Sequence, residues 1–273
     1  MQNYKHSLII LFLSFCFFAC EEEALEVNPA KLPVLNYGDT IQLTANMDVD
    51  WKLMPEGLAS ISAEGVLIAG DSSGSFVLEA VSKGDDSNRV EQDVFVSDRA
   101  ESINPLLEGG NIIYLRHAIA RTGNDLFNLG PEGWHLSCSS DTARQLSPEG
   151  FVQAQELGEA FKRLEIPFED TIYVSEYCRC IQTVEELALD LAFVTEKDIT
   201  FFVYDETQRH AKTQAFINSF TPTDKNVLIV SHSFAQGSTY QQPQQGYSVI
   251  FKKGNTEPKF QTVIRDDEFI LLK

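Results

Sequence analysis

The sequence predicts two folded units of different class, a small all-β sandwich followed by a three-layer α/β domain with a mostly parallel sheet. Three observations support this prediction. Apolar and polar residues alternate over residues 32–96, which is typical of strands with one buried face. Beyond residue 110, short apolar runs alternate with stretches of helical periodicity. Three of these apolar runs are followed by chemically reactive or charged side chains, at the strand ends where α/β domains carry their sites.

The N-terminus is typical of an export signal over residues 1–19 rather than of a folded domain. After a basic start, an apolar stretch over residues 8–19 is too short for a spanning helix and ends at Cys20. The letters FFAC at its end resemble a bacterial lipoprotein signal. This resemblance implies that Cys20 is acylated, that residues 20–31 form a lipid-anchored spacer, and that the protein lies in the cell envelope outside the cytoplasm. A plain secretory signal with an incidental cysteine is the alternative.

Short strands separated by turn residues are predicted over residues 32–96, and their spacing favours a small sandwich. The alternating apolar positions are Ile41, Leu43, Ala45, Val49, Trp51, Leu53, Phe76, Leu78 and Ala80. Residues 38–45, 49–51 and 60–66 resemble a bacterial Ig-like domain. The resemblance implies a spacer that holds the next domain away from the membrane, and no catalytic constellation appears within it.

A domain boundary is predicted over residues 97–110, which we expect to form a linker. The stretch begins with polar residues and ends with the pair Gly109 and Gly110, which is typical of a boundary between domains. The C-terminal domain should therefore extend over residues 111–273.

The C-terminal domain is predicted to alternate strands and helices. Ser147 followed by Pro148 predicts a helix start, because serine caps a helix well and proline fits its first turn. A buried helix face follows at Phe151, Ala154, Leu157, Phe161 and Leu164. A second helix is expected over residues 183–191. Strands are expected over residues 112–115, 172–174, 227–230, 248–252, 260–264 and 269–272.

Arginine and histidine residues gather after three of the predicted strands. Arg116 and His117 follow the first strand, Arg179 lies beyond the second, and His232 follows the third. Because the carboxyl ends of parallel strands meet at one edge of a sheet, we expect these four side chains to lie together. Guanidinium groups bind phosphate through paired N–H groups, and a neutral imidazole can attack phosphorus. The alternative is that the arginines only end strands or face solvent while the histidines are packed.

Four motifs occur in a meaningful order, at residues 115–118, 144–150, 175–183 and 230–232. Together they resemble the histidine phosphatase superfamily, in its phosphoglycerate-mutase-like branch. Ser233 follows the second histidine, where the branch of acid phosphatases and phytases has an aspartate. The resemblance implies that His117 is a nucleophile that forms a phosphohistidine. It also implies that Arg116, Arg179 and His232 bind the phosphoryl oxygens and stabilise the transition state.

Two further site residues are implied by the same resemblance. An acidic proton donor is expected between the second arginine and the second histidine, where we choose Glu206 with Asp205 as the alternative. The branch also has an asparagine that contacts the phosphate, six residues after the nucleophile. That position is Gly123 here, so Asn124 is the candidate substrate-binding residue.

Three cysteines lie beyond the predicted signal, at Cys138, Cys178 and Cys180. Outside the cytoplasm, Cys138 can form a disulfide with either of the other two cysteines. The alternative without a disulfide is that these cysteines are buried free thiols. Cys178 and Cys180 have no companion pair at metal-ligand spacing, so we expect no metal site. No cofactor is expected either.

The formal net charge of −19 disfavours nucleic acid as a partner, and an anionic substrate needs a local cluster of positive charge. The sequence therefore predicts an exported, membrane-anchored, metal-independent phosphatase that hydrolyses a phosphomonoester of a small molecule or a glycan. Hydrolysis is favoured over mutase transfer because a mutase is expected to act on cytoplasmic metabolites. The alternative from another class is a catalytically silent surface module that binds a phosphate or a glycan.

Overall fold

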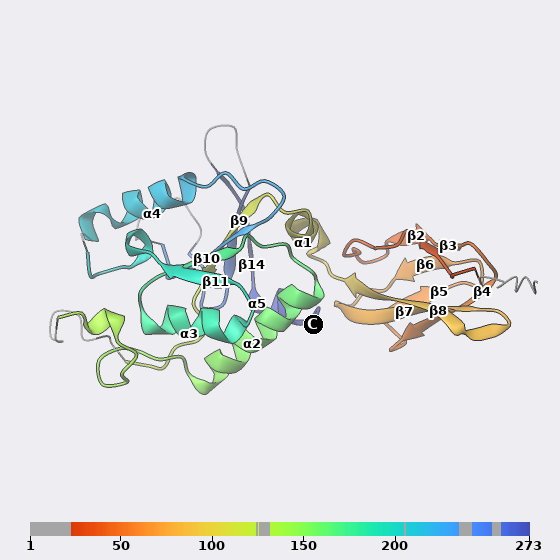
Figure 1. Cartoon of the computed structure of the whole chain (residues 1–273), viewed down its shortest axis with the longest axis horizontal. Helices are drawn as coiled ribbons and strands as arrows, with labels where there is room; N and C mark the ends of the chain where they lie inside the picture. Colours follow the sequence, from red (N-terminus) through yellow and green to blue (C-terminus); the bar gives the residue numbers. More distant parts are fainter. Residues whose placement is uncertain (1–22, 124, 126–131, 205, 235–241, 253–257) are drawn as a thin grey trace, which may run out of the picture.

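A computed structural model of the chain describes residues 23–123, 125, 132–204, 206–234, 242–252 and 258–273. Strands β1 to β8 form an all-β region, and the chain from strand β9 onward forms an α/β region, with helix α1 between them in sequence. Figure 1 shows the two regions next to each other along the long axis of the molecule. Within the described ranges, no helix has the length and apolar character needed to cross a membrane.

Two three-stranded antiparallel sheets share one hydrophobic core in the all-β region. The sheets have the strand orders β2-β6-β5 and β4-β7-β8, and β1 pairs with β3. The strands are β1 (Val27–Asn28), β2 (Thr40–Gln42), β3 (Thr44–Ala45), β4 (Val49–Met54), β5 (Ala59–Ile61), β6 (Val66–Ala69), β7 (Gly74–Ser82) and β8 (Asp85–Val96). Phe76, Leu78 and Ala80 of β7 are buried as predicted, but the burial does not alternate throughout the strand, because Glu79 and Val81 are buried as well.

The stretch predicted as a linker contains a helix instead, α1 (Ala100–Leu107). Its buried side chains are Ala100, Ile103 and Leu106. These positions are three residues apart, so they form one apolar face, which packs in a cluster with Val34 of the all-β region. The Asn104 side chain also accepts a hydrogen bond from the Val34 backbone N–H at 2.8 Å and donates one to its carbonyl oxygen at 2.9 Å. The predicted linker therefore contains a packed helix, whereas the domain boundaries themselves stay a prediction.

A six-stranded mixed sheet forms the centre of the α/β region, in the order β11-β10-β12-β9-β13-β14. The strands are β9 (Asn111–Arg116), β10 (Thr171–Val174), β11 (Ala192–Thr195), β12 (Val227–Ser231), β13 (Ser248–Lys252) and β14 (Lys259–Ile264). Neighbours from β11 to β9 run parallel, whereas β13 is antiparallel to both β9 and β14. Strand β11 was not predicted, and all of its residues are exposed at the edge of the sheet.

The last predicted strand, at residues 269–272, is wrong, because the chain forms helix α5 (Asp266–Ile270) there. Three acidic residues occupy the first turn of α5, where negative charge favours a helix start. Glu268 accepts a hydrogen bond from the Arg265 backbone N–H at 2.8 Å, which fixes this start. Phe269 and Leu272 are fully buried. Their spacing of three residues fits a helix face, whereas residues of one strand face alternate.

Helices cover both faces of the sheet, which gives the predicted three layers. One face packs against α1, α2 (Pro148–Arg163), α3 (Cys178–Leu187) and α5, and the other against α4 (Arg209–Asn218). Figure 1 shows α4 on the opposite side of the sheet from α2 and α3. Alternate residues of β9 serve the two cores, with Ile113 and Leu115 in the first and Ile112 and Tyr114 in the second. Ser147 caps α2 as predicted, since its side chain accepts from the Gly150 N–H.

Strands β10, β12 and β9 are adjacent and parallel, so their carboxyl ends lie at one edge of the sheet. All four predicted phosphate-binding and nucleophilic residues come from the chain at or beyond these ends. The topology therefore brings together three motifs that are far apart in the sequence.

Candidate active site

Two histidines lie side by side at the carboxyl ends of the central strands. His117 directly follows β9 and His232 directly follows β12. The two strand ends are joined by a hydrogen bond from the His117 backbone N–H to the Ser231 carbonyl oxygen at 2.9 Å. The imidazole centroids are 5.3 Å apart, in an edge-to-face arrangement. Both side chains are buried, with 3% of His117 and 5% of His232 exposed.

Arg179 links both histidines, and it comes from the first turn of helix α3. Its Nε donates to His117 Nε2 at 3.1 Å, and its Nη2 lies 3.4 Å from His232 Nδ1. On the other side of the guanidinium, Nη1 contacts both carboxylate oxygens of Asp125, at 3.0 and 2.9 Å. This ion pair is buried, with side-chain exposures of 9% and 3%. Asp125 therefore orients Arg179 so that its Nε and Nη2 face the two histidines.

The hydrogen bonds of His117 fix its tautomer. Nδ1 lies 2.8 Å from the Ala118 carbonyl oxygen, and a carbonyl only accepts, so Nδ1 carries the proton. Nε2 is then unprotonated, and its lone pair accepts the hydrogen bond from Arg179 Nε. Thr183 Oγ1 holds Ala118 in place by accepting from its backbone N–H at 3.0 Å. The more nucleophilic position of the imidazole is thus directed at the cation.

His232 is held by a hydroxyl group and two aromatic rings. Its Nε2 lies 2.9 Å from Ser175 Oγ, at the end of β10. The rings of Tyr177 and Phe201 pack against the imidazole at centroid distances of 4.9 and 5.1 Å. These contacts come from segments beyond β10, so they fix His232 relative to Arg179.

Both imidazoles are neutral at ordinary pH. Burial lowers the pKa of His117 well below its usual value, and the neighbouring Arg179 lowers it further. Burial also lowers the pKa of His232, again with Arg179 as the next cause. A neutral His117 keeps its lone pair available, which a nucleophile requires.

Arg116, the last residue of β9, completes the cluster of cations. Its Nη1 donates to the Pro243 carbonyl oxygen at 2.9 Å. Its Nε is buried and has no hydrogen-bond partner among the residues that the structure describes. Burial lowers the pKa of Arg116, and the nearby charges of Arg179 and Arg144 add to this effect. Two guanidinium groups beside two neutral imidazoles form a site suited to a phosphate dianion.

Several predicted site residues lie outside what the structure describes. Asn124, Asp205 and Cys20 are not among the described residues. Glu206 begins a short helical turn, η4 (Glu206–Gln208), but its side chain is not described. The roles predicted for these residues stay predictions.

Asp125 is the site residue that the sequence reasoning missed. It directly follows Asn124, the predicted substrate-binding residue. An acidic residue shortly after an Arg-His pair, in a domain expected to hold clustered arginines, could have been suspected as a counterion.

The disulfide alternative left open by the sequence is decided in favour of Cys138 with Cys178. Cys178 is the first residue of α3 and directly precedes Arg179, so the bond ties the preceding loop to the helix that carries Arg179. Cys180 is a buried free thiol, and burial raises its pKa to about 12, so it is not a nucleophile. Among the described residues, no group of three or more His, Cys, Asp or Glu side chains could hold a metal ion.

Comparison with known proteins bears on the α/β region. Residues 130–201 match the family model of the histidine phosphatase superfamily (branch 1). The chain contains a histidine phosphatase superfamily domain. The matched segment includes Arg179, whereas His117 and His232 lie outside it. The superfamily resemblance drawn from the sequence motifs is thereby confirmed, and no curated protein matches the chain.

Solved structures similar to this chain include three phosphatases. The protein histidine phosphatase SixA in complex with tungstate is 18% identical, with a TM-score of 0.40, over 57% of this chain and 97% of that one. The α-ribazole phosphatase from Shigella flexneri is 14% identical, with a TM-score of 0.37, over 57% and 96%. Phosphoserine phosphatase from Entamoeba histolytica in complex with 3-phosphoglyceric acid is 14% identical, with a TM-score of 0.39, over 58% and 98%.

Proposed function

We propose that this protein is a phosphatase that hydrolyses a phosphomonoester through a phosphohistidine formed on His117. The observation that carries the proposal is the unprotonated Nε2 of a neutral, buried His117, whose lone pair accepts a hydrogen bond from Arg179 Nε at 3.1 Å. A nucleophile beside a fixed cation suits attack on an anionic phosphoryl group. The histidine phosphatase family match supports the same class of reaction.

In the proposed mechanism, Nε2 of His117 attacks phosphorus and the bond from phosphorus to the leaving oxygen breaks. The bond electrons go to the leaving oxygen, which takes a proton from an acidic side chain. Arg116, Arg179 and His232 bind the phosphoryl oxygens and stabilise the charge of the transition state. Water then attacks the phosphohistidine and releases inorganic phosphate. The Nδ1–H bond to the Ala118 carbonyl stabilises the positive charge that His117 acquires in the first step.

Glu206 is proposed as the proton donor, with Asp205 as the alternative, and Asn124 as a further phosphate contact. After Asp205, the described part of the chain resumes with η4, which directly precedes helix α4. No metal or cofactor is needed for the proposed steps, because the arginines supply the positive charge. Chelator treatment should therefore leave phosphate release unchanged.

We further propose that the chain is exported and anchored in the cell envelope through an acylated Cys20, with residues 32–96 as an Ig-like spacer. The apolar stretch before Cys20 supports this proposal. Metabolic labelling with a fatty acid tests it, by comparing the wild type with Cys20→Ala. Label should appear only in the wild type, and equal labelling of both proteins would contradict the anchor. The substrate would then be a phosphorylated small molecule or glycan outside the cytoplasm.

Release of phosphate from an aryl phosphate tests the enzymatic proposal. We expect turnover by the wild type and none by His117→Ala, whereas His210→Ala, on the exposed start of α4, should behave as the wild type does. Phosphate binding without any turnover in the wild type would instead support the silent binding module.

A further inference from the structure

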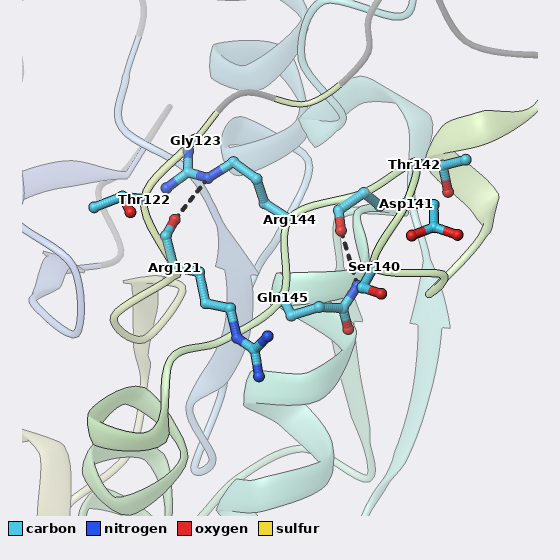
Figure 2. A pocket seen from close by; sticks show the side chains of 9 residues that line it. Arg121, Thr122, Gly123, Ser140, Asp141, Thr142, Arg144 and Gln145 are labelled. Carbon is cyan, nitrogen blue, oxygen red and sulfur yellow. Dashed lines mark hydrogen bonds between the residues drawn. The ribbon is translucent and has the colours of Figure 1, made fainter.

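A small pocket, most of whose lining residues carry polar or charged side chains, lies next to the catalytic cluster, between residues 121–123 and residues 140–145. Figure 2 shows the two segments facing each other, with the Arg144 side chain reaching across toward Gly123. The volume is about 150 Å³, which is room for one phosphate or carboxylate group with water. No part of the proposed chemistry at His117 uses this pocket.

The wall of the pocket is firmly attached to the catalytic helix. The Gln182 side chain, on α3, donates to Gln145 Oε1 at 2.8 Å and accepts from the Leu146 backbone N–H at 2.9 Å. The disulfide from Cys138 to Cys178 joins the start of the same segment to the first residue of α3. The pocket is therefore held in a fixed position relative to Arg179.

Arg144 supplies the positive charge at the inner end of the pocket. Its Nε donates to the Arg121 carbonyl oxygen at 3.1 Å, as the dashed line in Figure 2 shows. Among the described residues, its two Nη nitrogens have no hydrogen-bond partner. Arg121 lines the pocket as a second cation, and Asp141 is the one carboxylate among the lining residues.

The pocket is linked to the catalytic site through the Asp125 carboxylate, which contacts residues of both. The Arg144 backbone N–H donates to Asp125 Oδ1 at 3.0 Å, and the same carboxylate contacts Arg179 Nη1. Burial lowers the pKa of Arg144, and the nearby positive charge of Arg179 lowers it further, which fits two neighbouring guanidinium groups. A ligand held by Arg144 would thus lie beside a phosphoryl group held by Arg179.

We propose that this pocket binds a second anionic group of the substrate, either phosphate or carboxylate, while the phosphoryl group to be transferred lies at His117. This inference rests on the proposed phosphatase function and narrows its substrate class to doubly anionic phosphomonoesters. The chain as a whole has a net charge of −19, whereas four arginines gather around this one site. This local positive charge favours a doubly anionic ligand. Charge-assisted hydrogen bonds from a guanidinium give the pocket its selectivity over neutral groups.

Three matched series of alkyl phosphates test the proposal. Their members end in a hydroxyl, a carboxylate or a second phosphate, and chain length increases within each series. In the wild type, kcat/KM for an anionic end should exceed that for the hydroxyl end by about tenfold or more at the chain length that reaches the pocket. Comparing the carboxylate and phosphate arms distinguishes the two forms of the second group. In Arg144→Gln this preference should fall toward unity, and in Arg121→Gln it should fall less.

Arg89→Gln is the matched control, because Arg89 lies in the all-β region on β8. It should keep the wild-type preference. A wild type that hydrolyses all three series equally would overturn the proposal, as would a preference that survives in both pocket variants. If Arg144→Gln fails to fold, the wild-type series and Arg121→Gln decide the question. Failure of the proposed function is distinguishable, because the wild type would then hydrolyse no member of the series.

Discussion

Replacing Asp125 with asparagine should destabilise the free protein and strengthen its response to phosphate. Both carboxylate oxygens contact Arg179 Nη1, and the pair is almost completely buried. An asparagine must turn its NH₂ group toward the guanidinium at one of these positions, so the contact becomes repulsive. The buried charge of Arg179 then lacks its counterion.

The cost follows from the burial of the pair. Removing one partner of a buried ion pair costs about 3–5 kcal/mol, and an amide of the same shape places Asp125→Asn near the lower end. At about 2–4 °C per kcal/mol for a chain of this size, the melting temperature should fall by about 6–12 °C. Inorganic phosphate bound between Arg179 and the histidines would restore a negative partner, so it should raise the melting temperature of the variant by more than that of the wild type.

Differential scanning fluorimetry with and without phosphate measures both effects. Asp86→Asn is the matched control, because Asp86 is an exposed carboxylate of the all-β region with no ion pair to a described residue. It should change neither the melting temperature nor the phosphate response. An Asp125→Asn protein that is as stable as the wild type, or that gains no more from phosphate, would refute the idea that Asp125 balances and orients Arg179.

Three further outcomes are expected. Burial lowers the pKa of both active-site histidines, so the unfolded chain binds more protons than the folded chain below about pH 6.5. The free energy of unfolding, measured in urea, should therefore fall with acidification by up to about 1.4 kcal/mol per pH unit for each histidine. A fall that is equally steep after both are replaced by glutamine would contradict this cause. Cys138→Ser with Cys178→Ser should lower the unfolding free energy by about 2–4 kcal/mol, whereas Cys180→Ser should not reproduce the loss of the cross-link. A truncated chain that starts at Ser97 should melt earlier than the full chain, because Asn104 loses both backbone hydrogen bonds to Val34; equal melting temperatures would show that the regions are independent.

Much of the α/β fold was predictable because its strands and helices carry strong local signals. Strand β9 is a continuous apolar run, and Ser147 with Pro148 marks the start of α2. The errors occurred where tertiary packing outweighs local signals. Helix α1 depends on apolar residues spaced between polar ones, and the apolar residues at the end of α5 indicate a strand unless the acidic first turn of the helix is considered with them.

The candidate site was predictable as a set of residues but not as a geometry. The sequence indicated His117, Arg179 and His232 from their positions after strands. It could not show that Arg179 uses Nε toward His117 and Nη1 toward Asp125, since these contacts join segments 62 and 54 residues apart. The pocket of Arg144 was equally hidden, because it depends on two loops that meet only in the folded chain.

The central claim is tested most directly by looking for a phosphoryl group on His117 during turnover. Because phosphohistidine is labile in acid, the reaction with an aryl phosphate should be quenched in alkaline denaturant and digested for mass spectrometry. We predict a phosphoryl group on His117 of the wild type and on no other residue, and none in His117→Ala. A phosphoryl group on a different residue, or full turnover by His117→Ala, would contradict the account.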